Sequence, residues 1–237
     1  MHRLANPARF LRIITPIHPW LAMATLALLG WGMYLAWFAS PADYQQGETV
    51  RIMYIHVPAA WMALFVYTGM AVASFVFLVW KHPVADIFAR GSAPIGMAFA
   101  LITLMTGVIW GKPTWGAWWV WDARLTSMLI LFFLYVGYVA LAREAEHNEA
   151  MKKSCAVLAI VGFINIPIIK FSVEWWSTLH QPASVFRMDG PAIDDSMLKP
   201  LLVMALAFTA FYLTLAFCQV RIIVARSKLY RLRMMSL

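Results

Sequence analysis

Six apolar stretches constrain the fold of this chain more than any other feature of its sequence. They contain no Asp, Glu, Lys or Arg and cover residues 20–38, 59–80, 92–110, 125–142, 154–169 and 201–220. Each is close to the ~20 residues that an α-helix needs to cross about 30 Å of hydrocarbon. Within lipid, a helix satisfies all of its own backbone hydrogen bonds. The pattern therefore predicts an all-α integral membrane protein with six transmembrane helices.

The composition agrees with a lipid environment. With 62% hydrophobic and 13% charged residues and a mean hydropathy of +0.71, the chain is too apolar for a water-soluble domain. A nucleic-acid-binding protein would gather its basic residues on one water-facing surface, whereas here they are scattered in short loops between apolar stretches. We therefore expect no nucleic-acid partner and a single polytopic membrane domain over residues 1–237.

The basic residues predict the orientation of the helices. Of the 19 Lys and Arg residues, 13 fall on the side of the two termini and 6 on the opposite side. Basic residues in short loops remain in the cytoplasm, so both termini are expected to be cytoplasmic. The loops around 40–58, 111–124 and 170–199 are then external. We interpret the basic segment after residue 220 as an anchor that faces anionic lipid.

The fifth apolar stretch, residues 154–169, is the shortest and contains Asn165 and Pro167. Proline removes a backbone hydrogen bond inside a helix and is a common cause of kinks. We therefore expect this span to tilt, to kink or to extend into its flanking residues.

The segment 110–124, between the third and fourth stretches, concentrates aromatic side chains. It holds five of the chain's 12 tryptophans: Trp110, Trp115, Trp118, Trp119 and Trp121. If the chain is helical from Trp115 onward, four side chains share one face at i, i+3, i+4 and i+7. These are Trp115, Trp118, Trp119 and Asp122. Such a helix would lie along the membrane surface and present a broad aromatic platform.

Two interpretations of these tryptophans stay open on their pattern alone. Tryptophan is enriched at headgroup depth in membrane proteins, so the segment can be an interfacial aromatic belt. A belt, however, needs single rings at separate helix ends, and not five in one loop beside an aspartate and two glycines. Indole faces also stack on extended conjugated systems while they exclude water, which indicates a flat, conjugated ligand.

Two of the six histidines, His56 and His180, fall on the external side with the tryptophans, and each precedes a proline by two residues. We expect Pro58 in the first turn of the second helix, where its missing N–H has no cost, and Val57 in an extended conformation before it. That arrangement would hold the His56 ring at the top of the helix. The second proline of this pattern is Pro182.

A lone histidine at a lipid boundary is most often only a polar residue at that depth. Two of them beside a tryptophan cluster indicate a metal ligand pair, because neutral imidazoles on opposite faces of a porphyrin give six-coordinate haem iron. Zinc usually takes a third or fourth protein ligand, and the external acidic residues show no zinc-like spacing. We therefore take His56 and His180 as candidate axial ligands of haem.

The two propionates of haem need cationic partners where they are partly removed from water. The external candidates are Arg51, Lys112, Arg124 and Arg187. Arg124 is the most attractive because it lies close to Asp122, although for any single one an ordinary loop charge exposed to water is the simpler explanation. Asp122 either orients a ligand or caps the fourth helix through its N-terminal amides. The sequence leaves both roles open.

The run Trp110-Gly111 to Gly116-Ala117-Trp118-Trp119-Val120-Trp121-Asp122 resembles the WWD signature of the haem-handling proteins of cytochrome c maturation. The length, the six spans and one external histidine on each side of the signature resemble its C component, the CcmC family. The likeness extends over nearly the whole chain. Larger WWD relatives, which act in the final ligation of haem to cytochrome, have more spans than this chain can accommodate.

The resemblance implies a protein of the bacterial inner membrane that carries haem b as transient cargo at its external, periplasmic face. By position, His56 and His180 match the family's axial ligands, and the tryptophans and Asp122 match its WWD segment. The implied partners are the membrane-anchored haem chaperone CcmE, the ATP-driven exporter subunits CcmA and CcmB, and the small membrane protein CcmD. This chain has no P-loop signature, so we expect a haem-handling subunit and not an enzyme.

Two other functions remain as alternatives. A cytochrome b-like electron carrier with two histidine ligands would place them well within its helices, whereas the candidates here are expected at external span boundaries. A channel or ion-coupled transporter commonly has ionisable residues inside its spans, and the six stretches have none. The sequence favours haem delivery, with the cytochrome b-like subunit as the main alternative.

Overall fold

The computed structural model describes residues 5–145, 148–176, 178–181, 184–185 and 187–236, so Pro182 lies outside the described residues. Six helical segments in this part of the chain are long and apolar enough to cross a membrane. They are Pro7–Ala39, Glu48–Trp80, Pro83–Trp115, Ala123–Glu144, Glu149–Trp175 and Asp195–Met235. The predicted all-α architecture with six membrane spans is confirmed.

Every span is longer than the apolar stretch that predicted it, because capping residues and not hydropathy set the helix ends. The elements are α1 (Pro7–Tyr34), η1 (Leu35–Ala39), η2 (Glu48–Ile52), α2 (Met53–Trp80), α3 (Pro83–Trp115), α4 (Ala123–Glu144), α5 (Glu149–Gly162), α6 (Asn165–Trp175) and α7 (Asp195–Met235). Five helices begin after a side chain that accepts a backbone N–H bond of the first turn. These caps are Asn6, His82, Asp122, Asn148 and Asp194.

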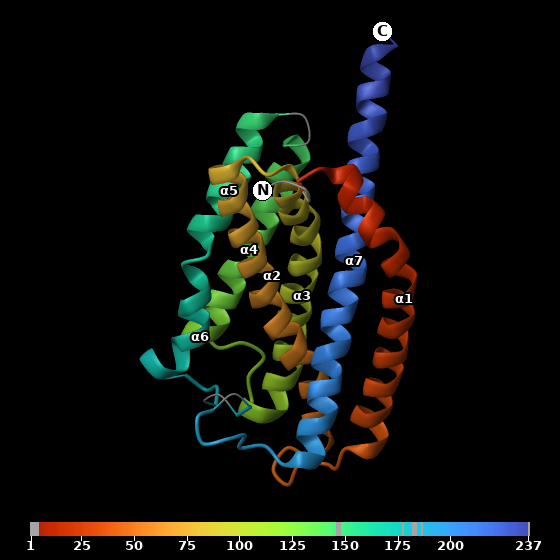
Figure 1. The fold of residues 1–237 in the computed structure, drawn as a ribbon. Coiled ribbons are helices and arrows are strands. Elements are labelled where there is room, and N and C mark those ends of the chain that lie inside the picture. The colour runs from red at the N-terminus through yellow and green to blue at the C-terminus, as the bar shows by residue number, and fades with distance from the viewer. Residues whose placement is uncertain (1–4, 146–147, 177, 182–183, 186, 237) are drawn as a thin grey trace.

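The helices form a bundle in which α1 and α7 pair along one side of α2 to α6 (Figure 1). Helix α1 begins and α7 ends at one end of this bundle. The loop between α3 and α4, the start of α2 and the end of α6 lie at the opposite end (Figure 1). The two candidate histidines and the tryptophan-rich segment therefore belong to the same end of the molecule. Which compartment that end faces stays a prediction from the basic residues.

Buried tyrosines lock the central helices together. The hydroxyl of Tyr135 on α4 lies directly over Gly96 of α3 and donates a 2.7 Å hydrogen bond to the carbonyl oxygen of Ala63 on α2. The Tyr67 hydroxyl lies over Gly162 in the same way, between α2 and α5. Glycine at these positions allows the close helix approach that is typical of packing in membranes. The core around α2, α3 and α4 is consequently a rigid scaffold.

The fifth span is broken, as predicted, and extends into its flanks. Helix α5 ends at Gly162 and α6 begins at Asn165, with Pro167 as the third residue of α6. The Asn165 amide Nδ2 donates a 2.8 Å hydrogen bond to the carbonyl oxygen of Ser127 on α4. This bond ties the start of α6 to α4, the helix against which α6 mainly packs.

Helix α3 begins before the apolar stretch 92–110 and so includes a charged pair that the stretch did not contain. Arg90 and Asp86 are both less than a tenth exposed, and the Arg90 Nη2 lies 2.7 Å from the Asp86 Oδ2. The two opposite charges compensate each other within one helix. A buried charge needs such a partner, because an unpaired charge away from water is strongly destabilising.

Candidate functional site

His56 lies inside α2, not beyond its end. The 3-10 turn η2 leads directly into α2 at Met53, so Val57 is helical and Pro58 lies within the helix. The expected extended conformation of Val57 and the place of Pro58 in the first turn are both wrong. The preference of a pre-proline residue for extended backbone is a bias that the continuous helix overrides. The His56 side chain therefore projects from a continuous helix, with helical residues before and after it in the chain.

Three residues of α3 surround the His56 ring. Its Nδ1 atom lies 2.9 Å from the Thr106 Oγ1, and its ring meets Trp110 edge to face at 5.6 Å between centroids. Gly107 makes the approach possible, since a Cβ atom there would lie 3.1 Å from the His56 Cε1. With Nδ1 engaged, Nε2 is the nitrogen available to a metal.

His180 lies in the loop after α6 and is held by the tryptophan-rich segment. Its Nδ1 atom lies 2.9 Å from the Asp122 Oδ2, and its ring meets Trp115 edge to face at 4.8 Å. Burial lowers the pKa of His180 below the ordinary value of 6.5, and the neighbouring Asp122 carboxylate opposes that shift. The imidazole is therefore neutral at pH 7, the form that binds metals, with Nδ1–H donating to Asp122 and Nε2 left for a ligand bond.

Asp122 makes contacts that fit both of the roles that the sequence left open. Its Oδ1 accepts a 2.7 Å hydrogen bond from the Leu125 amide and so caps α4, while its Oδ2 holds His180. The Asp122 side chain is only 5% exposed. One buried carboxylate thus couples the start of a transmembrane helix to the orientation of a candidate ligand.

The tryptophan-rich segment does not form the expected helix from Trp115 onward, and that prediction is wrong. Helix α3 ends at Trp115, and Gly116 adopts a left-handed conformation with φ of 76° that terminates it. Residues 116–122 have no regular structure. A left-handed residue favours glycine and is a frequent helix stop, so the glycine that interrupts the tryptophans was the relevant signal.

The indole rings consequently lie in different surroundings and do not form one common platform. Trp110 and Trp115 contact the two histidines, and Trp119 packs against the core. Trp118 and Trp121 are 58% and 75% exposed. Among the described residues, the Trp119 Nε1 is a buried donor without a hydrogen-bond partner, which is an opening for a ligand or partner that brings an acceptor.

The four candidate cations all have protein partners at this end of the bundle. Arg51 pairs with Glu48 and donates to the Ala36 carbonyl oxygen. The Arg124 Nε lies 3.2 Å from the Ser172 Oγ of α6. Lys112 donates to the Gly116 carbonyl oxygen, and Arg187 pairs with Asp189 at the surface. Arg51 and Arg124 are the half-buried members of this set, whereas Lys112 and Arg187 are exposed.

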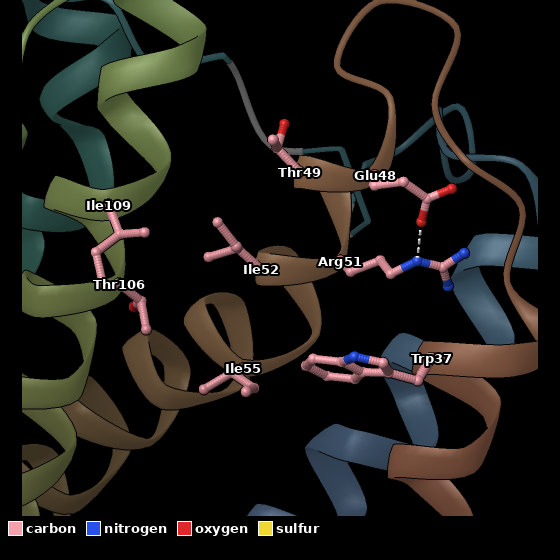
Figure 2. Close-up of a pocket in the computed structure, with 8 residues that line it drawn as sticks. All are labelled: Trp37, Glu48, Thr49, Arg51, Ile52, Ile55, Thr106 and Ile109. Carbon is pink, nitrogen blue, oxygen red and sulfur yellow. Dashed lines mark hydrogen bonds and ion pairs between the residues drawn. The ribbon is translucent and has the colours of Figure 1, made fainter.

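A pocket of about 520 Å³ opens beside His56, between η1, η2, α2 and α3. Figure 2 shows Thr106 and Ile109 on α3 facing Ile52 and Ile55, with the Arg51–Glu48 pair on the other side. Thr106 belongs to both features, because its hydroxyl contacts His56 and its side chain lines the pocket. The volume is in the range of small-molecule and cofactor sites, which are mostly apolar with a few polar groups.

Sequence reasoning missed the residues that hold the histidines. Thr106 and Gly107 lie inside the third apolar stretch, where one hydroxyl and one missing side chain carry no chemical signature. Ser172 and Gln46 contact Arg124 and Trp110 from distant parts of the chain. Gly107 gave a weak signal, since a glycine inside a helix often has a packing reason.

Comparison with known proteins identifies close relatives. A profile of the CcmC family, described as heme exporter protein C, matches residues 1–235. Heme exporter protein C of Bradyrhizobium diazoefficiens is 53% identical over 232 residues, which are 98% of this chain and 88% of that protein. Heme exporter protein C of Escherichia coli K12 is 43% identical over 93% of this chain and 89% of that protein. A cytochrome c biosynthesis ccmC-like mitochondrial protein of Marchantia polymorpha is 49% identical over 79% of this chain and 78% of that protein.

Proposed function

The chain belongs to the CcmC family of heme exporter proteins, and from this premise we propose that it holds haem b as transient cargo between His56 and His180. A haem-handling role in cytochrome c maturation follows from the family. The finer proposal is that haem is bound at the external, periplasmic face of the bacterial inner membrane and is delivered to the haem chaperone CcmE.

The contact of two histidines with the last turns of α3 is the observation that carries this proposal. His56 contacts Thr106 and Trp110, and His180 contacts Trp115. Thr106 and Trp115 are about 14 Å apart along the helix axis at 1.5 Å per residue. Each histidine presents its Nε2 because Nδ1 has a partner. This donor set suits haem iron, which takes two imidazoles on opposite faces of the porphyrin.

The surroundings provide what the rest of a haem needs. Trp110 and Trp115 flank the two ligands, and the apolar pocket beside His56 can receive one edge of the macrocycle. We assign the propionates to Arg124 and Arg51, with Arg187 as the more exposed candidate. The unpartnered indole N–H of Trp119 is a further donor to a carboxylate oxygen.

The contrast between the two ligands supports temporary custody and not a resident redox centre. His56 lies in a packed helix, but His180 lies in a loop, and loops open at lower free-energy cost than packed helices. Haem leaves when His180 dissociates and a porphyrin edge meets the chaperone. Two histidines well within helices would favour the cytochrome b-like alternative, whereas of this pair only His56 lies in a helix, and it lies near the start of α2.

The partners that we propose come from the family name and its chemistry. An exporter needs an energy source, and this chain has no P-loop, so CcmA and CcmB supply the ATP-driven step, together with the small membrane protein CcmD. Six apolar spans make lipid the remaining partner. Both termini face the cytoplasm in this proposal, because that side has most of the basic residues.

Co-purification of the protein with haem tests the proposal. We expect a low-spin spectrum with two imidazole ligands in the wild type, a changed ligand field in His56→Ala and in His180→Ala, and loss of haem in the double variant. His18→Ala is the matched control, because His18 belongs to α1 and contacts the Thr214 carbonyl oxygen of α7, not the residues of this site. A double variant that keeps the wild-type spectrum would refute the proposal.

A further inference from the structure

Thr106 makes a set of contacts that only one arrangement of protons satisfies. Its Oγ1 lies 2.6 Å from the carbonyl oxygen of Ile102 and 3.3 Å from that of Thr103, both in the preceding turn of α3. The same atom lies 2.9 Å from the His56 Nδ1. A threonine hydroxyl has one proton to donate and two lone pairs to accept with. Carbonyl oxygens cannot donate, so the hydroxyl proton is directed down the helix.

The direction of that proton determines the state of His56. Because the hydroxyl donates to the backbone, it can only accept from His56, and Nδ1 must therefore carry the imidazole proton. In a neutral imidazole, a proton on Nδ1 leaves the lone pair on Nε2. The Thr106 hydroxyl oxygen thus presents only an acceptor to the His56 Nδ1.

We propose that Thr106 is a positioning residue that fixes the tautomer and orientation of His56, so that its Nε2 lone pair is ready for iron before haem arrives. The inference rests on the proposed function, since it gives His56 the role of a ligand. It differs from the role of Asp122 at His180, because a hydroxyl orients the ring without adding a negative charge. His56 is therefore a neutral ligand with a neutral support, whereas His180 has an anionic support that makes its imidazole more basic.

Because of where Thr106 lies, its effect on the His56 ring can be tested separately from its contribution to packing. Its side chain lines the pocket and is not part of the buried core, as Figure 2 shows. Removal of the hydroxyl by Thr106→Val keeps the shape and the β-branch. Thr106→Ser keeps the hydroxyl and loses only a methyl group. The two variants therefore isolate the hydrogen bond.

The first test needs no haem. The haem-free full-length protein, labelled with ¹⁵N-histidine in lipid nanodiscs, gives the protonated nitrogen of each ring by NMR, and His56→Ala assigns the His56 signals. We expect the Nδ1–H form at His56 in the wild type and in Thr106→Ser, and a mixture of both tautomers in Thr106→Val. An Nε2–H form in the wild type, or the same tautomer in all three proteins, would overturn the inference.

The second test uses haem-loaded protein. We expect Thr106→Val to dissociate haem about tenfold faster, near the lower end of the effect of such supporting residues. Thr106→Ser should stay within about twofold of the wild type. The reduction potential of bound haem should shift in Thr106→Val alone. If both variants match the wild type while His56→Ala changes the ligand field of bound haem, the inference fails and the proposed function stands. If His56→Ala keeps the wild-type spectrum, the proposed function itself fails.

Discussion

His56 and His180 have the same side chain and, in our proposal, the same task, but the chain holds them in different ways. His56 is part of α2, and its ring contacts Thr106 and Trp110 of α3. Among the described residues, α2 and α3 are the most extensively packed pair of helices. His180 has no regular structure of its own; its ring contacts Asp122 and Trp115, and its backbone amide donates to the Thr178 hydroxyl in the same loop.

The difference shows how one site can both hold and release a ligand. To withdraw His180, the loop must lose a hydrogen bond to a charged group, about 1.5–3 kcal/mol, and an aromatic contact of about 0.5–1.5 kcal/mol. To withdraw His56, α2 must separate from α3. This separation would disrupt the core in which Tyr135 and Tyr67 join neighbouring helices. Release through His180 would therefore cost far less free energy, and in our proposal His56 is the fixed ligand.

Substitution of Asp122, the carboxylate that contacts His180, should have the largest effect on haem affinity. Asp122→Asn keeps an oxygen that can cap α4 but removes the negative charge that holds the His180 Nδ1–H. Loss of such a supporting group typically weakens metal binding by about 10–100-fold. Asp122→Ala should add a loss of about 0.5–2 kcal/mol in stability, because the cap disappears too. Haem titration and thermal unfolding of both variants measure the two effects separately.

Asp194 provides the control for Asp122, because it also caps a helix, α7, but through the Ser196 amide. No hydrogen bond between Asp194 and either histidine is found among the described residues. Asp194→Asn should leave haem binding unchanged. Wild-type affinity in Asp122→Asn would show that the carboxylate only caps α4, and the contrast between the two supports would disappear.

A smaller effect on haem affinity is expected when the His56 ring is displaced without loss of any polar group. Gly107→Ala places a methyl group 3.1 Å from the His56 Cε1, so the ring must shift by a few tenths of an ångström. We expect roughly tenfold weaker haem binding, at the lower end of what a disturbed ligand support costs. The absorption spectrum of bound haem should show a changed ligand field at the same time.

Gly137→Ala on α4 is the matched substitution, because its nearest neighbour would be Leu158 Cδ2 at an ordinary 3.9 Å. Replacement of a helical glycine by alanine there should be neutral or slightly stabilising, since alanine is the better helix former. Equal haem affinity in the two alanine variants would mean that the close fit of His56 against α3 has no part in binding.

The sequence predicted the six spans and the irregular fifth span, and failed where the exact course of the backbone matters. The six spans follow from hydropathy, and the break before Pro167 follows from its missing N–H. The predicted helix after Trp115 failed because Gly116 stops α3. The predicted extended Val57 failed because η2 joins α2 before Pro58.

In the candidate site, the histidines and tryptophans could be identified from the sequence by residue type, but the residues that hold them in place could not. Asp122 was recognisable as either a cap or a ligand support, and only the structure shows that its two oxygens do both. Thr106 is an unremarkable residue of an apolar helix until the fold brings His56 against it. A hydrogen bond between residues 50 positions apart is a property of helix packing that local sequence does not contain.

The fixed and releasable ligands can be told apart most directly by carbon monoxide, which binds reduced haem by displacing one axial ligand. The haem-loaded wild type, His180→Ala and His56→Ala would each be reduced, exposed to carbon monoxide and compared by their Fe–CO vibrations. We predict that the wild-type adduct matches that of His180→Ala, because His56 stays on the iron while His180 leaves. A wild-type adduct that matches His56→Ala, or haem spectra unaffected by either substitution, would contradict this account.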